Sequence, residues 1–307
     1  MNILVATEKP FAAVAVDGIR KVADAAGYQL TLLEKYTSKQ ELLEAVAQAD
    51  ALIVRSDIVD AEVIEAGKGR LKVIVRAGAG YDNIDLAAAT AAGMVVENTP
   101  GQNSNAVAEL VFGMAVMAAR NMYAGTSGFE LKGKKLGIQA FGQVGRNVAR
   151  IAGGFGMEVS AVDPYCPDTV MTEAGVTPVH DVAQLYRDNR FVSIHIPATP
   201  DTIKSIGYDL IASMPKNGVL INTARKEVID EDGLLKALTE RTDLKYVADI
   251  RPANADVLLE QCAGRVFFTP KKMGAQTAEA NINAGIAAAN QSVAYLRDGI
   301  DRFKVNK

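Results

Sequence analysis

Short apolar runs alternate with amphipathic segments along most of the chain. The apolar runs have the length and the bulky residues that are typical of buried strands. They are Ile3–Val5, Leu30–Leu33, Ala51–Val54, Val73–Val75, Met94–Val96, Lys135–Ala140, Val159–Val162, Phe191–Ile196, Val219–Asn222, Tyr246–Asp249 and Val266–Thr269. The helices predicted between them include Ser38–Ala47, Asp60–Ala66, Ala183–Arg187 and Gly233–Thr239. Strands that alternate with helices in this way predict parallel sheets with helices on both faces.

Two long helical segments divide the chain. Asn103–Asn121 is apolar, and Thr277–Leu296 is rich in alanine. A chain of 307 residues is long for a single core, so we expect two domains. The second helix would return the chain to the first domain, which we therefore expect to comprise residues 1–98 and 285–307, with residues 99–284 forming the other. The predicted fold class is α/β, with two doubly wound parallel-sheet domains, Rossmann-like or flavodoxin-like, and a cleft between them.

A glycine-rich turn joins two of the predicted strands. Residues 134–163, KKLGIQAFGQVGRNVARIAGGFGMEVSAVD, contain a strand, a turn with Gly142 and Gly145, a helix, and a second strand that ends at Asp163. This order is typical of the first half of a dinucleotide-binding unit. The helix N-terminus would bind the pyrophosphate, and Gly142 would let the backbone approach it. Gly145 would allow close packing of helix and strand.

Asp163 is the feature that favours a cofactor over an ordinary strand-to-helix turn. It lies where an acid accepts hydrogen bonds from the ribose hydroxyls, and its negative charge would repel the 2′-phosphate of NADP. Ala140 stands where the fingerprint has its first glycine. The expected cofactor is NAD, and the residues of this segment that we expect to bind it are Gly142, Gln143, Val144, Gly145, Asp163 and Pro164.

Composition and charge exclude several other classes of protein. The net charge is −3 and there is no basic tract, so we expect no nucleic-acid or membrane partner. No apolar run approaches the length of a membrane span, and the N-terminus resembles a strand and not a signal peptide. The two cysteines, Cys166 and Cys262, lack metal or redox spacing. These features predict a cytoplasmic enzyme or binding protein without a metal.

Cationic residues follow several of the predicted strands. Ligands of doubly wound sheets bind at the carboxyl ends of strands, and several arginines and lysines there indicate an anionic substrate. The polar strand-end segments are Arg55-Ser56, Arg76 to Gly80, Asn222 to Arg225, Asp249 to Arg251 and Lys271-Lys272. A single arginine in such a place is more often part of a surface ion pair. The Gly78-Ala79-Gly80 backbone could add N–H donors to an anion site.

The chain resembles the D-2-hydroxyacid dehydrogenases over nearly its full length. The resemblance is carried by the segments VRAGAGYDNIDLAAATAAGMVVENTPGQNSNAVAEL, LGIQAFGQVGRNVA, VDPY, VSIHIPATPDT and VLINTARKEVIDEDGLLKAL. It implies hydride exchange between NAD and the hydroxyl-bearing carbon of a small 2-hydroxy acid.

The resemblance also assigns roles to individual residues. Arg225 matches the arginine that holds the substrate carboxylate and the reacting oxygen. The substrate-binding positions that it implies are Arg55, Ser56, Ala77, Gly78 and Asn103. The further positions expected to bind the cofactor are His195, Pro197, Thr202, Thr223, Asp249 and Gly274, with Thr199 beside them on the adenosine side.

The chain departs from this family at the catalytic acid/base. The family uses a histidine after the Thr-Pro of a late strand, but here Thr269-Pro270 is followed by Lys271 and Lys272. Counting forward from Pro270 places Lys271 at the histidine position, whereas counting back from Gly274 and Thr277 places Lys272 there. The glutamate that orients the histidine is replaced by Asn254. Loss of both members of the pair favours a changed mechanism, although two solvated lysines in an inactive protein would give the same pattern.

A lysine can act as the acid/base if its pKa falls from the free value of about 10.4. Burial or an adjacent cation such as Arg225 would lower it. The absence of a glutamate is consistent with that shift. In oxidation the neutral amine would take the hydroxyl proton, and in reduction the ammonium would return it.

The replacement of histidine by lysine and the length of the chain resemble the short D-3-phosphoglycerate dehydrogenases. The expected function is therefore the NAD-dependent oxidation of 3-phosphoglycerate to 3-phosphohydroxypyruvate in serine biosynthesis, with Arg55 and Ser56 at the phosphate. A hydroxypyruvate or glyoxylate reductase, or another D-2-hydroxyacid dehydrogenase, is the nearest alternative. An NAD-sensing binding protein is the second. From the resemblance alone we expect a homodimer.

Overall fold

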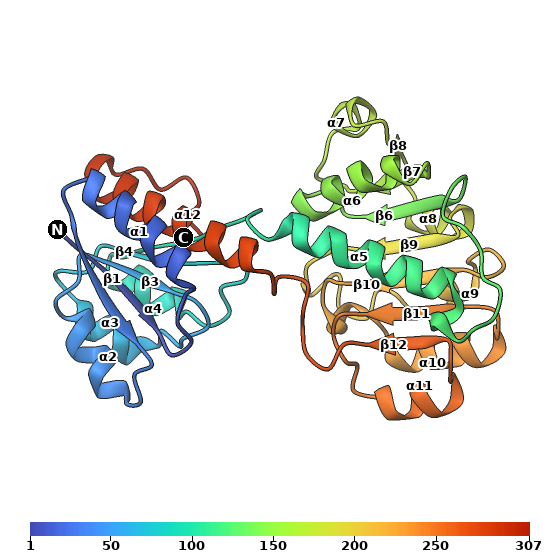
Figure 1. Cartoon of the computed structure of the whole chain (residues 1–307), viewed down its shortest axis with the longest axis horizontal. Coiled ribbons are helices and arrows are strands. Elements are labelled where there is room, and N and C mark those ends of the chain that lie inside the picture. The colour runs from blue at the N-terminus through green and yellow to red at the C-terminus, as the bar shows by residue number, and fades with distance from the viewer. The chain divides into compact units, whose positions relative to one another are not determined.

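The computed structural model describes all 307 residues, which form two compact units (Figure 1). The first unit comprises Met1–Asn103 and Gln276–Lys307, and the second comprises Ser104–Ala275. The expected boundaries, 98/99 and 284/285, differ from these. At the second boundary the difference arises because 284/285 falls inside helix α12 (Ala278–Asp298), whereas the units divide before this helix begins; the Thr277 side chain caps the helix by accepting the Ala280 N–H at 3.1 Å.

The first unit contains a five-stranded parallel sheet in the order β2-β1-β3-β4-β5. Its strands are β1 (Asn2–Thr7), β2 (Gln29–Glu34), β3 (Ala51–Val54), β4 (Val73–Arg76) and β5 (Val95–Asn98). The central residues of β1, β3 and β4 are fully buried, as helix-covered parallel strands require, whereas β2 at the edge of the sheet is only half-buried. The strand order reverses between β1 and β3, so a ligand-binding crevice is expected at the carboxyl ends of these two strands.

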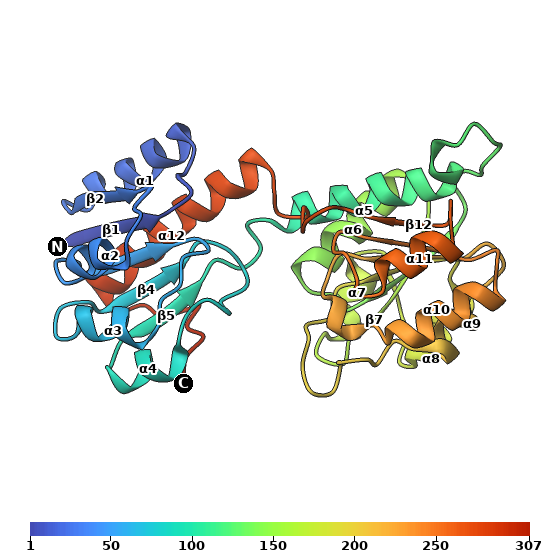
Figure 2. The same ribbon diagram turned by 90° about the horizontal axis from the view of Figure 1, so that it is seen from below.

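Helices cover both faces of this sheet (Figures 1 and 2). One core cluster joins α1 (Ala13–Ala25) and α12 to the sheet, and α1 and α12 lie side by side. The opposite face packs against α2 (Lys39–Val46), α3 (Ala61–Gly67) and α4 (Leu86–Ala91). The Ser38 side chain and Glu41 form a capping box at the start of α2, which explains why this helix begins where the pattern predicts.

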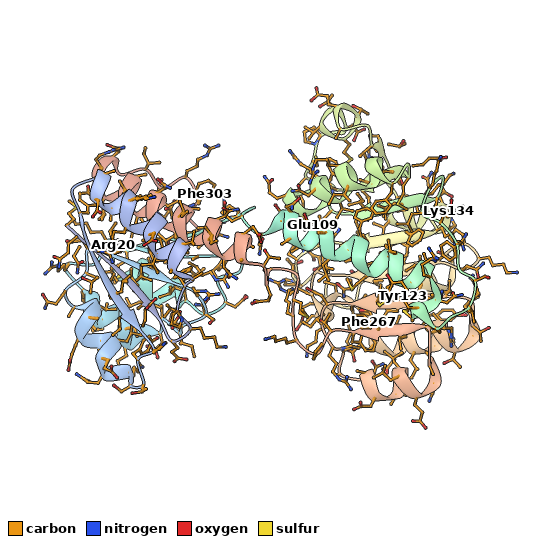
Figure 3. All side chains as sticks on the ribbon, viewed as in Figure 1. Arg20, Glu109, Tyr123, Lys134, Phe267 and Phe303 are labelled. Carbon is orange, nitrogen blue, oxygen red and sulfur yellow. The ribbon has the colours of Figure 1, made fainter.

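The C-terminal segment pairs with β5 at the edge of the first sheet. Asn306 is 4% exposed; its Oδ1 accepts the Val96 N–H at 2.8 Å, and its Nδ2 donates to the Met94 carbonyl and the Thr90 hydroxyl. The N–H of Phe303, labelled in Figure 3, donates to the Glu97 carboxyl. This pairing covers an edge that would otherwise expose unpaired backbone groups.

The second unit contains a seven-stranded parallel sheet in the order β12-β11-β10-β9-β6-β7-β8. Its strands are β6 (Lys135–Gln139), β7 (Glu158–Val162), β8 (Thr177–Pro178), β9 (Phe191–Ile194), β10 (Val219–Asn222), β11 (Lys245–Ala248) and β12 (Val266–Phe268). The order reverses between β6 and β9, so the glycine-rich turn after β6 lies at the switch point.

The helices of the second unit also cover two faces. Helix α5 (Ser104–Ala119) and α6 (Gln143–Gly154) lie side by side on one face (Figure 1), near α7 (Asp168–Glu173). The other face packs against α8 (Val182–Asp188), α9 (Tyr208–Ala212), α10 (Glu231–Glu240) and α11 (Ala255–Gln261). Short 3₁₀ turns occur at Asn121–Tyr123 and Lys226–Val228.

The predicted fold class is confirmed, since both sheets are parallel and doubly wound. None of the helices combines the length and apolar character that crossing a bilayer requires. The strand β8 was not among the predicted elements, because it has two residues and one of them is a proline.

Candidate functional site

The glycine-rich turn between β6 and α6 is tightly packed. A Cβ on Gly145 would lie 2.3 Å from the Ala140 carbonyl oxygen and 3.1 Å from the Ile138 side chain. Only glycine fits there, as the sequence predicts. Ala140 has a φ of +80°, a conformation that glycine adopts at much lower cost. The turn thus keeps the geometry of the fingerprint although its first glycine is replaced.

The N-terminus of α6 has the features of an anion site. Gly142 is its N-cap, and no side chain caps the helix. The first-turn N–H groups, those of Gln143, Val144 and Gly145, have no partner within the helix, and the helix dipole adds positive charge. Nothing lies within 4 Å of the place where a Gly142 Cβ would be, so the backbone there is accessible. These residues fit the pyrophosphate of NAD.

Asp163 lies directly after β7 and is bound to this turn. Its Oδ2 accepts the Phe141 N–H at 2.8 Å, and its Oδ1 accepts the Tyr165 N–H at 2.9 Å. Each carboxylate oxygen can accept a second hydrogen bond, so the group can still bind ribose hydroxyls. Pro164 next to it is exposed.

The segment from His195 to Thr202 follows β9, across the switch point from the glycine-rich turn. His195 Nε2 lies 2.9 Å from the Ser193 hydroxyl, and burial lowers the pKa of the imidazole to about 3. The ring is therefore neutral at physiological pH. The Thr202 hydroxyl donates to the Pro197 carbonyl at 2.6 Å and accepts the Thr199 N–H at 2.7 Å. Thr202 thus stabilises the shape of this loop.

The end of β10 is organised by Asn222, a buried residue that had no predicted role of its own. Its Oδ1 accepts the Ala224 N–H at 2.9 Å, and its Nδ2 donates to the Arg225 carbonyl at 3.0 Å. The neighbouring Thr223 is 4% exposed, and its hydroxyl has no hydrogen-bond partner. An unpaired buried hydroxyl at a strand end is suited to bind a ligand.

Arg225 and Lys272 converge on one backbone carbonyl. Arg225 Nη1 donates to the Ala224 oxygen at 3.0 Å, and Lys272 Nζ donates to the same oxygen. The two side chains come from the loops after β10 and β12. Their shared acceptor places two positive charges a few ångströms apart, which is an arrangement suited to an anionic substrate.

The two candidate lysines differ in their surroundings. Both are exposed overall, but only Lys272 has a hydrogen bond that brings its ammonium to Arg225. The backbone carbonyl of Lys271 accepts the Thr269 hydroxyl at 2.8 Å, so this residue shapes the loop through its main chain. Of the two lysines, Lys272 is therefore the one whose ammonium lies beside Arg225.

Asp249 lies beneath the lysine-bearing loop. It is 0% exposed and follows β11, and its Oδ2 accepts the Gly274 N–H at 2.9 Å. A Cβ on Gly274 would lie 2.8 Å from that oxygen, so this position requires a very small residue. Burial raises the pKa of the Asp249 carboxyl, while the charges of Lys272 and Arg225 oppose that shift.

The predicted phosphate residues lie at the switch point of the first sheet. The Arg55 guanidinium donates to the carbonyls of Lys9 and Pro10, at 2.9 and 3.2 Å, and to Asn281 Oδ1 at 2.8 Å. It also stacks over the Phe11 ring, 5.0 Å from its centroid. These bonds use three of its five N–H groups. Arg55 is therefore largely held by its own unit.

The other residues predicted to bind the substrate are Ser56, Ala77, Gly78 and Asn103. Arg76 Nε donates to the Arg55 carbonyl at 2.9 Å, and a Cβ on Gly78 would lie 1.4 Å from Arg76 Nη1. Gly78 has a φ of +150°. Ala77 is 9% exposed and donates its N–H to the Val54 carbonyl. The two other predicted residues are Ser56, which is exposed, and Asn103, which directly precedes α5.

Asp57 is a residue that sequence reasoning missed in this region. It is 6% exposed and accepts the Glu8 N–H at 2.7 Å, the Tyr36 hydroxyl at 2.9 Å and the Arg55 N–H at 3.3 Å. It thereby joins the ends of β1, β2 and β3. Its position three residues after the end of β3 was the only available signal.

Comparison with known families identifies the second unit. The family model described as the D-isomer specific 2-hydroxyacid dehydrogenase, NAD binding domain, matches residues 105–270, which is most of this unit. The chain belongs to this family. The expected family and the expected NAD cofactor are confirmed.

Two enzymes are similar to this protein over most of its chain. D-3-phosphoglycerate dehydrogenase of Methanocaldococcus jannaschii is 39% identical over 291 residues, which cover 88% of this chain and 54% of that protein. Hydroxypyruvate reductase of Thermotoga maritima is 35% identical over 278 residues, which cover 84% of this chain and 88% of that protein. The chain spans about half the length of the first of these relatives.

A solved structure of the family extends the similarity to the whole fold. The crystal structure of NAD⁺-bound 3-phosphoglycerate dehydrogenase of Entamoeba histolytica has a TM-score of 0.87 and 45% sequence identity. The match covers 100% of this chain and 99% of that one. Both units therefore have the fold of this 2-hydroxyacid dehydrogenase.

Proposed function

We propose that this chain is an NAD-dependent D-3-phosphoglycerate dehydrogenase that interconverts 3-phosphoglycerate and 3-phosphohydroxypyruvate in serine biosynthesis. The observation that carries the proposal is the convergence of Arg225 and Lys272 on the Ala224 carbonyl. It supplies a carboxylate-binding cation and a proton carrier side by side. The names of two similar proteins, from M. jannaschii and E. histolytica, support the choice of substrate.

In the proposed reaction the protein residues bind the substrate and move one proton. Bound NAD would supply the acceptor for the hydride that leaves C2 of the hydroxy acid. Arg225 forms a bidentate contact with the carboxylate and fixes its orientation. Lys272, as the neutral amine, accepts the hydroxyl proton in oxidation and returns it as the ammonium in reduction. The positive charge of Arg225 favours the neutral amine.

The phosphate is assigned to Arg55 and Ser56 at the switch point of the first sheet. Two N–H groups of the Arg55 guanidinium remain after its three internal bonds, enough for one bidentate contact. The contact with Phe11 and the bond to Asn281 hold the guanidinium in one orientation. A fixed arginine binds an anion with little loss of side-chain freedom.

A second candidate function is reduction of hydroxypyruvate or glyoxylate. Two observations favour it: most of the hydrogen-bonding capacity of Arg55 is used within its own unit, and the similar T. maritima protein is named a hydroxypyruvate reductase. The same chemistry would then act on an unphosphorylated acid. An NAD-sensing binding protein would bind the cofactor without turnover.

Substitution of the two lysines tests the proposed mechanism. We expect Lys272→Ala to lower kcat by about 10²- to 10⁴-fold, because general acid/base catalysis contributes that much, with NADH affinity unchanged. Lys271→Ala is the matched control and should keep nearly full turnover. Steady-state kinetics and NADH titration of both variants provide the measurement. Full turnover in Lys272→Ala would refute the lysine mechanism.

We further propose that the enzyme acts as a homodimer in the cytoplasm. Sedimentation velocity of the purified protein measures the oligomeric state. A single species with the mass of one 32.6 kDa chain at micromolar concentration would contradict the dimer.

A further inference from the structure

The loop that carries Lys272 is fastened to Asp249. The Gly274 N–H donates to Asp249 Oδ2 at 2.9 Å. Gly274 lies two residues after Lys272 in the chain. Because a Cβ on Gly274 would lie 2.8 Å from the carboxylate, the loop and the acid are in direct contact.

Asp249 has unused capacity and two cationic neighbours. Its side chain is 0% exposed, and Oδ1 has no hydrogen-bond partner. A buried carboxylate is costly unless nearby charges compensate it. Lys272 and Arg225 provide that compensation, since both stabilise the ionised form. Tyr246 is the other titratable side chain affected by Asp249; burial, with a smaller contribution from the carboxylate, raises the pKa of Tyr246, so it remains a neutral phenol.

Asn254, at the position where the resemblance predicts a glutamate, belongs to a different network. Its N–H donates to the Glu231 carboxylate at 3.0 Å, and its Nδ2 donates to the Glu231 backbone carbonyl at 3.0 Å. Glu231 also accepts the Ala253 N–H at 2.9 Å. Glu231 is thus engaged with the backbone before α11, whereas Asp249 is the buried carboxylate that interacts with Lys272.

We propose that Asp249 is the positioning residue of Lys272, holding its loop through the Gly274 backbone amide and supplying the negative charge that the neutral Asn254 does not. This inference rests on the proposed function of Lys272. The lysine then sits between opposing influences: Arg225 favours the amine and Asp249 favours the ammonium. Removal of the Asp249 charge leaves the influence of Arg225, so Lys272 should lose its proton at a lower pH.

Amine labelling tests the inference without requiring turnover. The wild-type protein and Asp249→Asn are treated with acetic anhydride in short pulses at pH values from 6 to 10, and peptide mass spectrometry measures the labelled fraction of each lysine. We expect the pH of half-maximal labelling of Lys272 to fall by about one unit in Asp249→Asn, the lower end of the effect of a nearby opposite charge. Lys271 in the same peptide is the internal control. An unchanged Lys272 profile would overturn the inference.

Kinetics separate this role from a contact with the cofactor. For reduction of 3-phosphohydroxypyruvate, the alkaline limb of the kcat/KM profile should move to lower pH in Asp249→Asn and return in Asp249→Glu. Asp256→Asn, which removes an exposed carboxylate paired with Arg251, should leave the profile unchanged. A raised KM for NADH with an unmoved limb would contradict the positioning role.

Two further variants keep the test decisive. If Asp249→Asn does not fold, Gly274→Ala displaces the same carboxylate while keeping its charge in the chain, and should shift the labelling profile in the same direction by a smaller amount. An unshifted Gly274→Ala profile would then count against the inference. Lys272→Ala distinguishes the two proposals, because full turnover there refutes the lysine mechanism whatever the effect of Asp249.

Discussion

Ala140 is a residue whose backbone conformation is unfavourable for its side chain. Its φ of +80° belongs to a region that costs an alanine about 1–2 kcal/mol. The strain persists because the carbonyl of Ala140 packs against Gly145 and its N–H donates to the Val162 carbonyl. The turn is therefore fixed by its neighbours and not by its own residue type.

We predict that Ala140→Gly stabilises the protein. The relief of backbone strain exceeds the entropy that glycine gains in the unfolded chain, so the free energy of unfolding should rise by about 1 kcal/mol. Ala263→Gly, in an exposed turn without positive φ, is the control and should be slightly destabilising. Urea unfolding measures both. A destabilised Ala140→Gly variant would show that the conformation is not strained.

His195 links stability to pH. Its pKa is about 3 in the folded protein because of burial, compared with about 6.5 when unfolded. Between pH 3 and 6.5 the unfolded state therefore binds more protons than the folded state. The stability that depends on a neutral His195 is fully present above pH 6.5 and is lost as the pH falls towards 3. The residue as a whole keeps some solvent exposure, so we expect a loss of about 1 kcal/mol in the free energy of unfolding between pH 6.5 and 5.

The variant His195→Gln should lose less stability than the wild type over that interval. His180→Gln removes an exposed histidine that pairs with Asp168 and serves as the matched control. Unfolding in urea at pH 7, 6 and 5 gives the slope of the free energy of unfolding against pH for the wild type and the two variants. Equal slopes for the wild type and His195→Gln would mean that the imidazole is not desolvated.

Single residues were predictable where their role depends on local spacing. Gly145 and Asp163 follow from the glycine fingerprint, since turn, helix and strand are consecutive. The contact between Lys272 and the Ala224 carbonyl joins residues 48 positions apart, and no local pattern encodes it. The same holds for the burial of Asp249 against Gly274. The sequence therefore left the choice between the lysines open.

At the scale of elements, strand prediction succeeded where apolar runs are buried on both faces. Strand β3 has the predicted bounds, Ala51–Val54, because all four residues are buried. The predicted run Phe191–Ile196 is longer than β9, which ends at Ile194, since His195 and the next residue leave the sheet. Short helices such as α9, with five residues, carry too few periodic positions to be recognised.

The C-terminal segment is an element whose anchoring can be tested directly. Asn306→Ala removes three hydrogen bonds and leaves the Val96 N–H and the Met94 carbonyl buried without partners. We expect a loss of about 2–3 kcal/mol in the stability of the first unit. Asn290→Ala, on the exposed side of α12, is the control and should change little. Thermal unfolding of both variants measures the effect. Equal melting temperatures for Asn306→Ala and Asn290→Ala would contradict the anchoring role.

At the scale of the whole molecule, the fold and the cofactor follow from the family, while the substrate depends on a few side chains. Arg225, proposed for carboxylate binding, and Lys272, proposed for proton transfer, belong to the second unit. Arg55 and Ser56, proposed for phosphate binding, belong to the first. The sequence predicted both groups from their places after strands. It could not show that Arg55 bonds to Lys9, Pro10 and Asn281, since those contacts depend on tertiary structure.

The central claim is that this chain reduces 3-phosphohydroxypyruvate with NADH in preference to unphosphorylated 2-oxo acids. Oxidation of NADH, followed at 340 nm, gives kcat/KM for 3-phosphohydroxypyruvate, hydroxypyruvate, glyoxylate and pyruvate. A bidentate arginine–phosphate contact predicts a preference of about 10- to 100-fold for the phosphorylated acid. A preference for hydroxypyruvate or glyoxylate, or NADH binding without turnover of any of the four, would contradict the account.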